Sequence, residues 1–163
     1  MTRKNYAAGM LMFKKEKNTL QYFLVHPGGP FFSKKDTGVW TIPKGVPENK
    51  ETPIETAKRE FGEETGVKPL PPYIYLGNIK QKGGKMVEAW AFEYTENTPI
   101  NLNSNTFKIE WPPKSGNKAI FPEVDKGMFF NYEKALVKIN PNQAPFLDRL
   151  RTLFNTQNGL KET

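Results

Sequence analysis

The sequence contains no cysteine and only one histidine, His26. Without cysteine the chain forms no disulfide, no thiolate zinc site and no cysteine nucleophile. A single histidine likewise excludes histidine-rich metal sites and most catalytic triads. The absence of cysteine fits a reducing compartment, so we expect a cytoplasmic protein.

Long hydrophobic runs are also absent. The apolar stretch Tyr6–Phe13 follows the basic pair Arg3 and Lys4 in the manner of a signal peptide, but it has only eight residues. It ends in four charged residues, Lys14–Lys17, with no small-residue cleavage site, so a β-strand is the better interpretation. No stretch approaches the roughly 18 apolar residues of a membrane span, and we expect no membrane partner.

The composition is typical of a folded domain. Hydrophobic residues make up 37% of the 163 residues and aromatic residues 13%, which is enough for a core. We expect one domain over residues 1–163, with a loose tail at 155–163. Apolar patterning predicts strands at 6–13, 19–25, 73–81 and 85–94, and helices at 132–139 and 144–154.

The charge is basic and unevenly spread. The net charge is +7, yet the stretch Gly45–Gly66 has six glutamates against three basic residues. An acidic site in a basic surround suits a polyphosphate that is bound through metal and flanking cations. The alternative is that the lysines only aid solubility.

The acidic stretch also contains the clearest helix of the sequence. Thr52 is a good N-cap, Pro53 suits the first helical position, and Glu55 completes a capping box. We expect the helix to end near Thr65, because Gly66 is typical of the position that follows a helix. Ile54, Ala57 and Phe61 share one face of this helix, and Glu60, Glu63 and Glu64 share another.

The glutamate stripe needs an explanation, because like charges at these spacings cost roughly 0.2–0.5 kcal/mol per pair in an isolated helix. A solvated acidic face is one interpretation of Glu60, Glu63 and Glu64. The other is a metal site, because hard cations such as Mg²⁺ or Mn²⁺ bind carboxylate oxygens.

The spacing of the whole stretch decides between these interpretations. Gly45–Val67 reads G-x5-E-x7-R-E-φ-x-E-E-x-G-φ, where φ is apolar, and it resembles the signature box of the Nudix hydrolases at all nine specified positions. A chance match in a chain of this length has a probability of about 10⁻⁷. The resemblance implies the Nudix fold, an α/β/α sandwich around a mixed β-sheet, and water attack on a pyrophosphate.

The resemblance also implies roles for residues of the box. Glu60, Glu63 and Glu64 would bind Mg²⁺ or Mn²⁺, with the carbonyl of Lys44 as a further ligand, and one of these glutamates or a distal one would act as base. Glu51 and Arg59 would pair and hold the preceding loop against the helix. Gly45 would let the chain pass close to the metals.

Residues outside the box supply further candidates. The form Trp-x-x-Pro-Lys-Gly around Lys44 resembles Nudix branches acting on dinucleoside polyphosphates, diphosphoinositol phosphates and RNA 5′ ends, so Lys44 is a candidate phosphate contact. The segment Phe121–Phe130 resembles the region before the last helix of Nudix proteins, where an acidic residue often reaches back to the metals. The resemblance makes Glu123 our choice for a distal metal ligand, with Glu110 in reserve, although Glu123 also suits a turn. Trp111 is a candidate for stacking on a base or for anchoring a loop. His26 is a candidate substrate contact or a hydrogen-bonded residue at a strand end.

These features predict a divalent-metal-dependent pyrophosphohydrolase of a nucleotide substrate, either an NTP or a dinucleoside polyphosphate. The segments HPGGPFF, SNTFKIEWPPKSG and FPEVD further resemble a bacterial subgroup of predicted NTP pyrophosphohydrolases. Two alternatives stay open: an RNA 5′-pyrophosphohydrolase, which is the same chemistry on another substrate, and a non-catalytic nucleotide-binding Nudix module. A plain nucleic-acid-binding protein would rest on charge alone.

Overall fold

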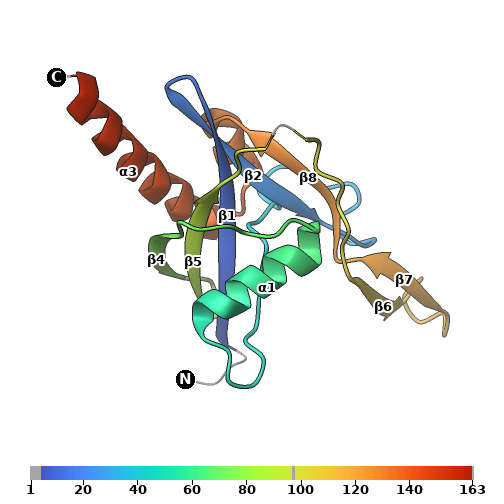
Figure 1. Ribbon diagram of the computed structural model, residues 1–163. Coiled ribbons are helices and arrows are strands. Elements are labelled where there is room, and N and C mark those ends of the chain that lie inside the picture. The colour runs from blue at the N-terminus through green and yellow to red at the C-terminus, as the bar shows by residue number, and fades with distance from the viewer. Residues whose placement is uncertain (1–4, 97, 163) are drawn as a thin grey trace.

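A computed structural model describes residues 5–96 and 98–162, and of residues 158–162 it describes the backbone only. Its main sheet has six strands: β1 (Tyr6–Glu16), β2 (Thr19–Pro27), β3 (Lys44–Gly45), β4 (Ile74–Lys80), β5 (Met86–Glu93) and β8 (Val124–Phe130). The strand order is β4-β5-β1-β2-β8, and β3 pairs with β1 (Figure 1). The sheet is mixed, because β1 is parallel to β5 and antiparallel to β2.

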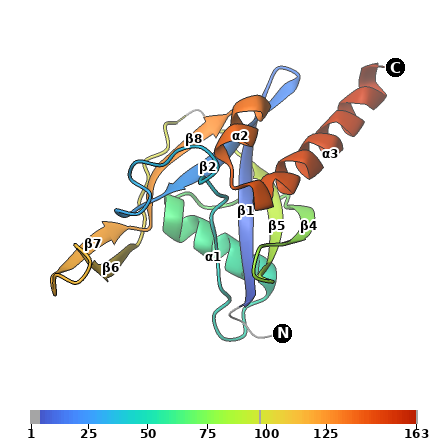
Figure 2. The same cartoon turned by 180° about the vertical axis from the view of Figure 1, so that it is seen from behind.

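Three helices cover the two faces of this sheet. They are α1 (Pro53–Thr65), α2 (Tyr132–Lys138) and α3 (Ala144–Glu162), with a short 3₁₀ turn at Pro141–Gln143 before α3. α1 lies on one face, and α2 and α3 lie on the opposite face (Figures 1 and 2). The predicted α/β/α sandwich around a mixed sheet is therefore confirmed.

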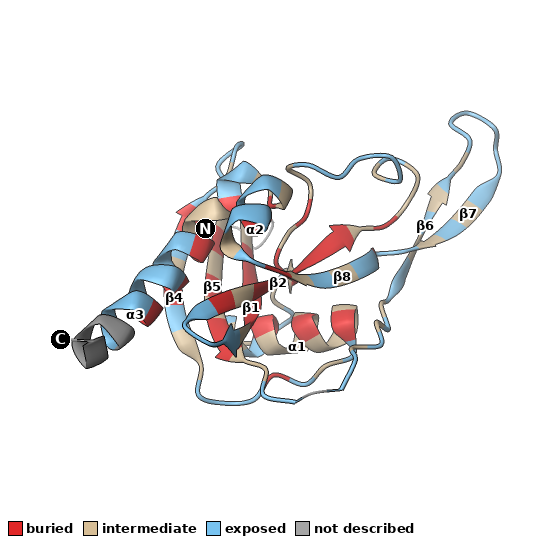
Figure 3. Ribbon diagram, turned by 90° about the horizontal axis from the view of Figure 1, so that it is seen from above, coloured by how far each residue is buried: buried red, intermediate tan, exposed pale blue. Residues whose placement is uncertain are grey.

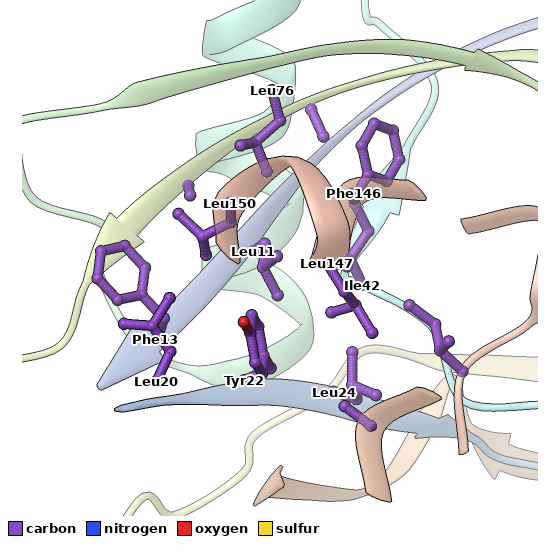
Figure 4. Close-up of a cluster of buried hydrophobic side chains, with 14 of the residues drawn as sticks. Leu11, Phe13, Leu20, Tyr22, Leu24, Ile42, Leu76, Phe146, Leu147 and Leu150 are labelled. Carbon is purple, nitrogen blue, oxygen red and sulfur yellow. The ribbon is translucent and has the colours of Figure 1, made fainter. Parts of the chain in front are cut away.

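The alternation of side chains along β1 builds a separate core on each face. Ala7, Leu11 and Phe13 face α3, where they pack in a cluster with Leu147 and Leu150 (Figure 4). The even-numbered residues face the other way and join a second cluster with side chains of α1. β1 is buried on both faces, as expected for the central strand of a sandwich.

A second, two-stranded sheet stands apart from the main one. β6 (Thr106–Glu110) and β7 (Lys118–Pro122) form an antiparallel hairpin that projects from the body of the molecule, and most of its surface is exposed (Figure 3). Apolar patterning predicted the strands β1, β2, β4 and β5 of the main sheet, but it did not predict β7 or β8.

The end of the chain also differs from the prediction. A loose tail was expected from residue 155, whereas α3 continues to Glu162. Residues 155–162 contain no proline, and the Thr156 hydroxyl donates to the Thr152 carbonyl at 2.8 Å within the helix. Among the described residues, no helix is long and apolar enough to cross a membrane.

Candidate active site

The glutamates lie on α1, and local sequence fixes both ends of this helix. The Thr52 hydroxyl accepts a hydrogen bond from the Glu55 backbone at 3.4 Å, and the Glu55 carboxylate accepts one from the Thr52 backbone at 3.2 Å. At the other end Gly66 adopts a left-handed conformation with φ 76°, and its N–H donates to the Gly62 carbonyl. The helix predicted from the capping box is confirmed.

Arg59 organises the carboxylates around the helix. Its guanidinium contacts Glu51 through two hydrogen bonds, of 2.7 and 3.0 Å, so the expected pair between these residues is present. The same group donates to Glu60 at 2.9 Å and to Glu63 at 3.1 Å. It also donates to the Val46 carbonyl at 3.1 Å, which ties the preceding loop to the helix.

The Arg59 guanidinium also sets the charge state of Glu51. Together with hydrogen bonds from Glu48 and Thr56, it lowers the pKa of the Glu51 carboxyl from its usual 4.5 to about 2. Glu51 is therefore ionised at neutral pH, and the pKa of Arg59 is raised in turn. The ion pair between Glu51 and Arg59 therefore stabilises the loop before α1 against the helix.

Gly45 is necessary because the backbone passes directly over Glu60. A Cβ atom placed on Gly45 would lie 2.0 Å from the carboxyl carbon of Glu60. No side chain fits in that space. Sterics therefore explain the glycine at the start of the box, because only a residue without a side chain lets β3 lie against the carboxylate stripe of α1.

Glu64 is the most perturbed of the glutamates. Its Oε2 atom is buried and has no hydrogen-bond partner. Burial, with the nearby negative charge of Glu60, raises the pKa of the Glu64 carboxyl to about 8, although Lys44 opposes the shift. Burial also raises the pKa of Glu60, with the Arg59 guanidinium opposing it.

Two lysines lie near these carboxylates. Burial lowers the pKa of Lys44, the positive charge of Lys85 lowers it further, and Glu64 and Glu60 raise it. Lys44 therefore lies near the two half-buried glutamates and near a second lysine. Sequence reasoning missed Lys85, because its position follows from the pairing of β5 with β1, which in turn pairs with β3.

The structure separates the two candidates for a distal acidic residue. Glu123 lies between β7 and β8, where its charge raises the pKa of both Glu60 and Glu64. Glu110 lies at the outer end of the β6–β7 hairpin, where its carboxylate accepts a hydrogen bond from the Lys114 backbone at 2.8 Å. Glu123 is thus the distal carboxylate near the box, and Glu110 caps a turn.

Among the described residues, the contacts of the other two candidates are with groups other than the box glutamates. His26 is 1% exposed, and its Nδ1 and Nε2 atoms contact the Asp125 carboxylate and the Lys35 carbonyl, each at 2.7 Å. Both ring nitrogens are engaged, which supports the hydrogen-bonded role rather than substrate contact. Trp111 follows β6 at the outer end of the hairpin, about 17 Å along the strands from its base.

The donor set fits a divalent cation. The unpartnered oxygen of Glu64 needs a positive partner, and Glu60, under the bare Gly45 backbone, adds a second hard oxygen ligand. Within residues 5–96 and 98–162, no three acidic or histidine side chains converge as a preformed metal site. The reason is that Arg59 holds Glu60 and Glu63, so a cation would compete with the guanidinium for these carboxylates.

Comparison with known protein families identifies a match over nearly the whole chain. A family model described as the NUDIX domain matches residues 3–150. No curated protein is similar enough in sequence to count as a match.

Several solved structures share the fold. An Ap4A hydrolase from C. elegans, in a binary complex, has a TM-score of 0.67 at 17% identity. The superposed part is 92% of this chain and 98% of the Ap4A hydrolase chain. The NUDIX domain of Shewanella oneidensis NrtR, complexed with ADP ribose, has a TM-score of 0.64 at 15% identity. The superposed part is 90% of this chain and 86% of the NrtR chain. A MutT protein from Methanosarcina mazei Go1 has a TM-score of 0.58 at 19% identity, with 94% of each chain covered. At these identities the likeness establishes the shared fold.

Proposed function

This chain belongs to the Nudix family of hydrolases, which act on pyrophosphate bonds, and we propose that its substrate is a nucleoside polyphosphate. The substrate would be an NTP or a dinucleoside polyphosphate, and the reaction would depend on Mg²⁺ or Mn²⁺. We also propose that residues 1–163 form one Nudix domain, since helices on both faces share a single central sheet.

The observation that carries the metal dependence is the buried, unpartnered oxygen of Glu64 beside Glu60. Ionising this carboxyl group without a bound cation costs free energy, because burial penalises a charge that lacks a partner. Glu60, Glu63 and Glu64 would hold the metal, with the Lys44 carbonyl and Glu123 as further ligands. When bound, the metal lowers the pKa of water and offsets charge on the phosphates.

Residues of the chain would perform the remaining tasks. The Lys44 ammonium group, with Lys85 nearby, would contact the phosphates and offset their charge. Glu63, whose side chain is 37% exposed against 15% for Glu60, is the more accessible of the two and would accept a proton from water. Arg59 would position Glu60 and Glu63 through its contacts with their carboxylates.

The choice of a nucleotide rests on charge and on the relatives. Two lysines beside a metal site suit a substrate with several phosphates. The solved structures with the same fold include an Ap4A hydrolase and a domain that binds ADP ribose, which makes nucleotides the first class of substrate to examine.

A hydrolysis screen tests the proposal. Purified protein is incubated with Mg²⁺ or Mn²⁺ and a panel of NTPs, dinucleoside polyphosphates and nucleotide sugars, and the products are resolved by chromatography. We expect cleavage of at least one nucleoside polyphosphate, its loss on chelation, and a fall in kcat of about 100-fold or more in Glu64→Gln and Glu63→Gln.

The matched control is Glu133→Gln, which removes an exposed carboxylate from the first turn of α2. It should retain full activity. Binding of a nucleotide without turnover under all metal conditions would instead identify a non-catalytic module.

A further inference from the structure

A pocket lies between the turn of the β1–β2 hairpin, the start of α2 and the middle of α3, on the face of the sheet opposite α1 (Figure 2). Its volume is about 430 Å³, which is typical of small-molecule sites. None of the described residues that line it belongs to Gly45–Val67. The pocket is therefore separate from the candidate active site, and the proposed function does not use it.

Tyr22, on β2, lines this pocket and is buried without a partner for its hydroxyl group. The residue is 1% exposed, and its ring packs among apolar side chains of β1 and α3 (Figure 4). Within residues 5–96 and 98–162, the Tyr22 hydroxyl forms no hydrogen bond. The other five tyrosines each donate one to a carboxylate or a backbone carbonyl. Because buried hydroxyl groups are normally hydrogen-bonded, this one indicates a ligand in the pocket.

Arg151 lies beside Tyr22 and has no acidic partner. Burial raises the pKa of the Tyr22 hydroxyl, and the positive charge of Arg151 opposes that rise, so the two groups are close. The guanidinium carbon of Arg151 is 3.9 Å from the centroid of the Tyr132 ring, a cation–π contact. The carboxylate of Asp148, three positions earlier in α3, accepts a hydrogen bond from the Tyr132 hydroxyl instead. In the described part of the chain Arg151 forms no ion pair, so its charge is open to an anion.

The remaining walls of the pocket are neutral or apolar, with one exception. Leu20 and Phe154 are 5% and 8% exposed and supply an apolar wall. Side-chain amides come from three asparagines, Asn18, Asn131 and Asn155. Glu133 is the one acid among the described lining residues, and its charge disfavours a ligand with two negative charges more than a ligand with one. The lining thus suits a single carboxylate on a body that carries hydroxyl groups.

We propose that this pocket binds a small hydroxylated carboxylate of the sugar-acid class, with the carboxylate group between the Arg151 guanidinium and the Tyr22 hydroxyl. A guanidinium group matches a planar carboxylate with two parallel N–H donors, and the protonated phenol adds a third donor. The asparagine amides would bind the hydroxyl groups, and Leu20 and Phe154 would contact the carbon skeleton. The proposal is independent of the proposed function, because it concerns residues outside the box.

NMR titration of the ¹⁵N-labelled full chain with sodium D-glucuronate tests this binding. The backbone amide signals of Thr19, Asn131 and Asn155 should shift in a saturable way, with NaCl added to keep the ionic strength constant. We expect a Kd of about 1 mM or below for a ligand of this size. Neutral methyl D-glucoside, which lacks the carboxylate, should bind more weakly by about tenfold or more.

Two variants test the two groups that would hold the carboxylate. Arg151→Gln should raise Kd by about tenfold or more, because the carboxylate loses its charged partner. Tyr22→Phe removes only the hydroxyl group and should raise Kd by about three- to tenfold. The Tm of Tyr22→Phe without ligand should equal or exceed that of the parent, because no protein group loses a hydrogen bond. A purely structural hydroxyl group would give the reverse result, a lower Tm with unchanged binding.

Lys118→Gln is the matched control, because it removes one positive charge from an exposed position on β7, outside the pocket. It should bind D-glucuronate as the parent does. Equal losses in Lys118→Gln and Arg151→Gln would overturn the proposal, since they would indicate attraction by net charge alone. Inorganic phosphate that shifts the same amide signals with the same Kd, or no saturable shift with D-glucuronate or D-gluconate, would also overturn it.

A hydrolysis assay separates this proposal from the proposed function. Arg151→Gln should cleave the best nucleotide of the panel at the parent rate, because Arg151 lies outside the candidate active site. Absence of cleavage by the parent with every substrate would refute the proposed function, whereas the NMR titration tests the pocket without any turnover.

Discussion

Among single residues, Gly45 has the strictest requirement. Because an added Cβ would lie 2.0 Å from the Glu60 carboxyl carbon, Gly45→Ala must displace either β3 or the Glu60 side chain. A shift of about 1 Å in a catalytic group lowers activity by about 100-fold. We expect a loss of this size in kcat/KM, measured on the best substrate from the nucleotide panel.

Gly62→Ala is the matched control for that change. Gly62 lies in α1, and a Cβ there would meet only the Val67 carbonyl at an ordinary 3.8 Å. Alanine favours a helix by roughly 0.8–1 kcal/mol over glycine, so this variant should be active and slightly more stable. Retained activity in Gly45→Ala would show that Glu60 is not part of the reacting site.

The Glu51 carboxylate gives a pH-dependent contribution to stability. Its pKa is about 2 in the folded protein against a usual 4.5, so its contribution is fully present above pH 4.5 and is lost as the pH falls towards 2. Glu51→Gln should lower the free energy of unfolding by about 2 kcal/mol at pH 7. The difference from the parent should shrink between pH 4.5 and pH 2.

Urea denaturation at about pH 7, 4.5 and 3 measures this difference. The variant Glu133→Gln, at an exposed carboxylate, serves as the control and should follow the parent at each pH. A Glu51→Gln deficit that stays constant across this range would mean that the pair with Arg59 contributes nothing through its charge.

The sequence predicted the residues whose partners are close along the chain. Glu51 and Arg59 lie eight positions apart and pair as expected. Lys85 was missed, because it comes near Lys44 through the pairing of strands that are distant in sequence. No spacing rule within one stretch of sequence describes such neighbours.

Among the secondary-structure elements, α1 packs on the sheet through a small set of buried side chains, of which Phe61 is the largest. Phe61 is fully buried, with its ring centroid 5.1 Å from that of Phe92 and 6.3 Å from that of Phe23. Phe61→Ala should lower the free energy of unfolding by about 3–5 kcal/mol, through lost burial and a cavity. Thermal or urea unfolding measures the loss.

Phe61→Leu keeps an apolar side chain at the same site and should lose less than the alanine variant. Equal losses in the two variants would indicate that the ring geometry, rather than the filled volume, holds α1 in place.

The helix α1 was predictable because its signals are local. Thr52, Pro53 and Gly66 mark its ends, and the apolar positions fix its buried face. β7 and β8 were not predicted, because few of their residues are buried and their sequences therefore show little apolar periodicity. β7 alternates between exposed and half-buried residues, and β8 buries only its first and last residues. α3 extends beyond its predicted end at residue 154. The prediction followed the apolar stripe, which stops at Phe154, whereas the helical backbone continues to Glu162.

For the molecule as a whole, the layers were predictable and the sheet order was not. The resemblance of one 23-residue stretch implied a sandwich, and the order β4-β5-β1-β2-β8 became visible only in the structure. Charge behaves in the same way. A net +7 is evident from composition, but only the fold brings Lys85 near Lys44 and the glutamates of the box.

The central place of β1 has a consequence for synthesis. β1 pairs with β5 from Tyr6 opposite Met86 to Phe13 opposite Glu93, so the strand made first waits for a partner that is made 80 residues later. At 5–20 residues per second, the ribosome needs ~4–16 s to supply that partner. During this interval β1 has an open strand edge, which can pair with another chain until β5 is made.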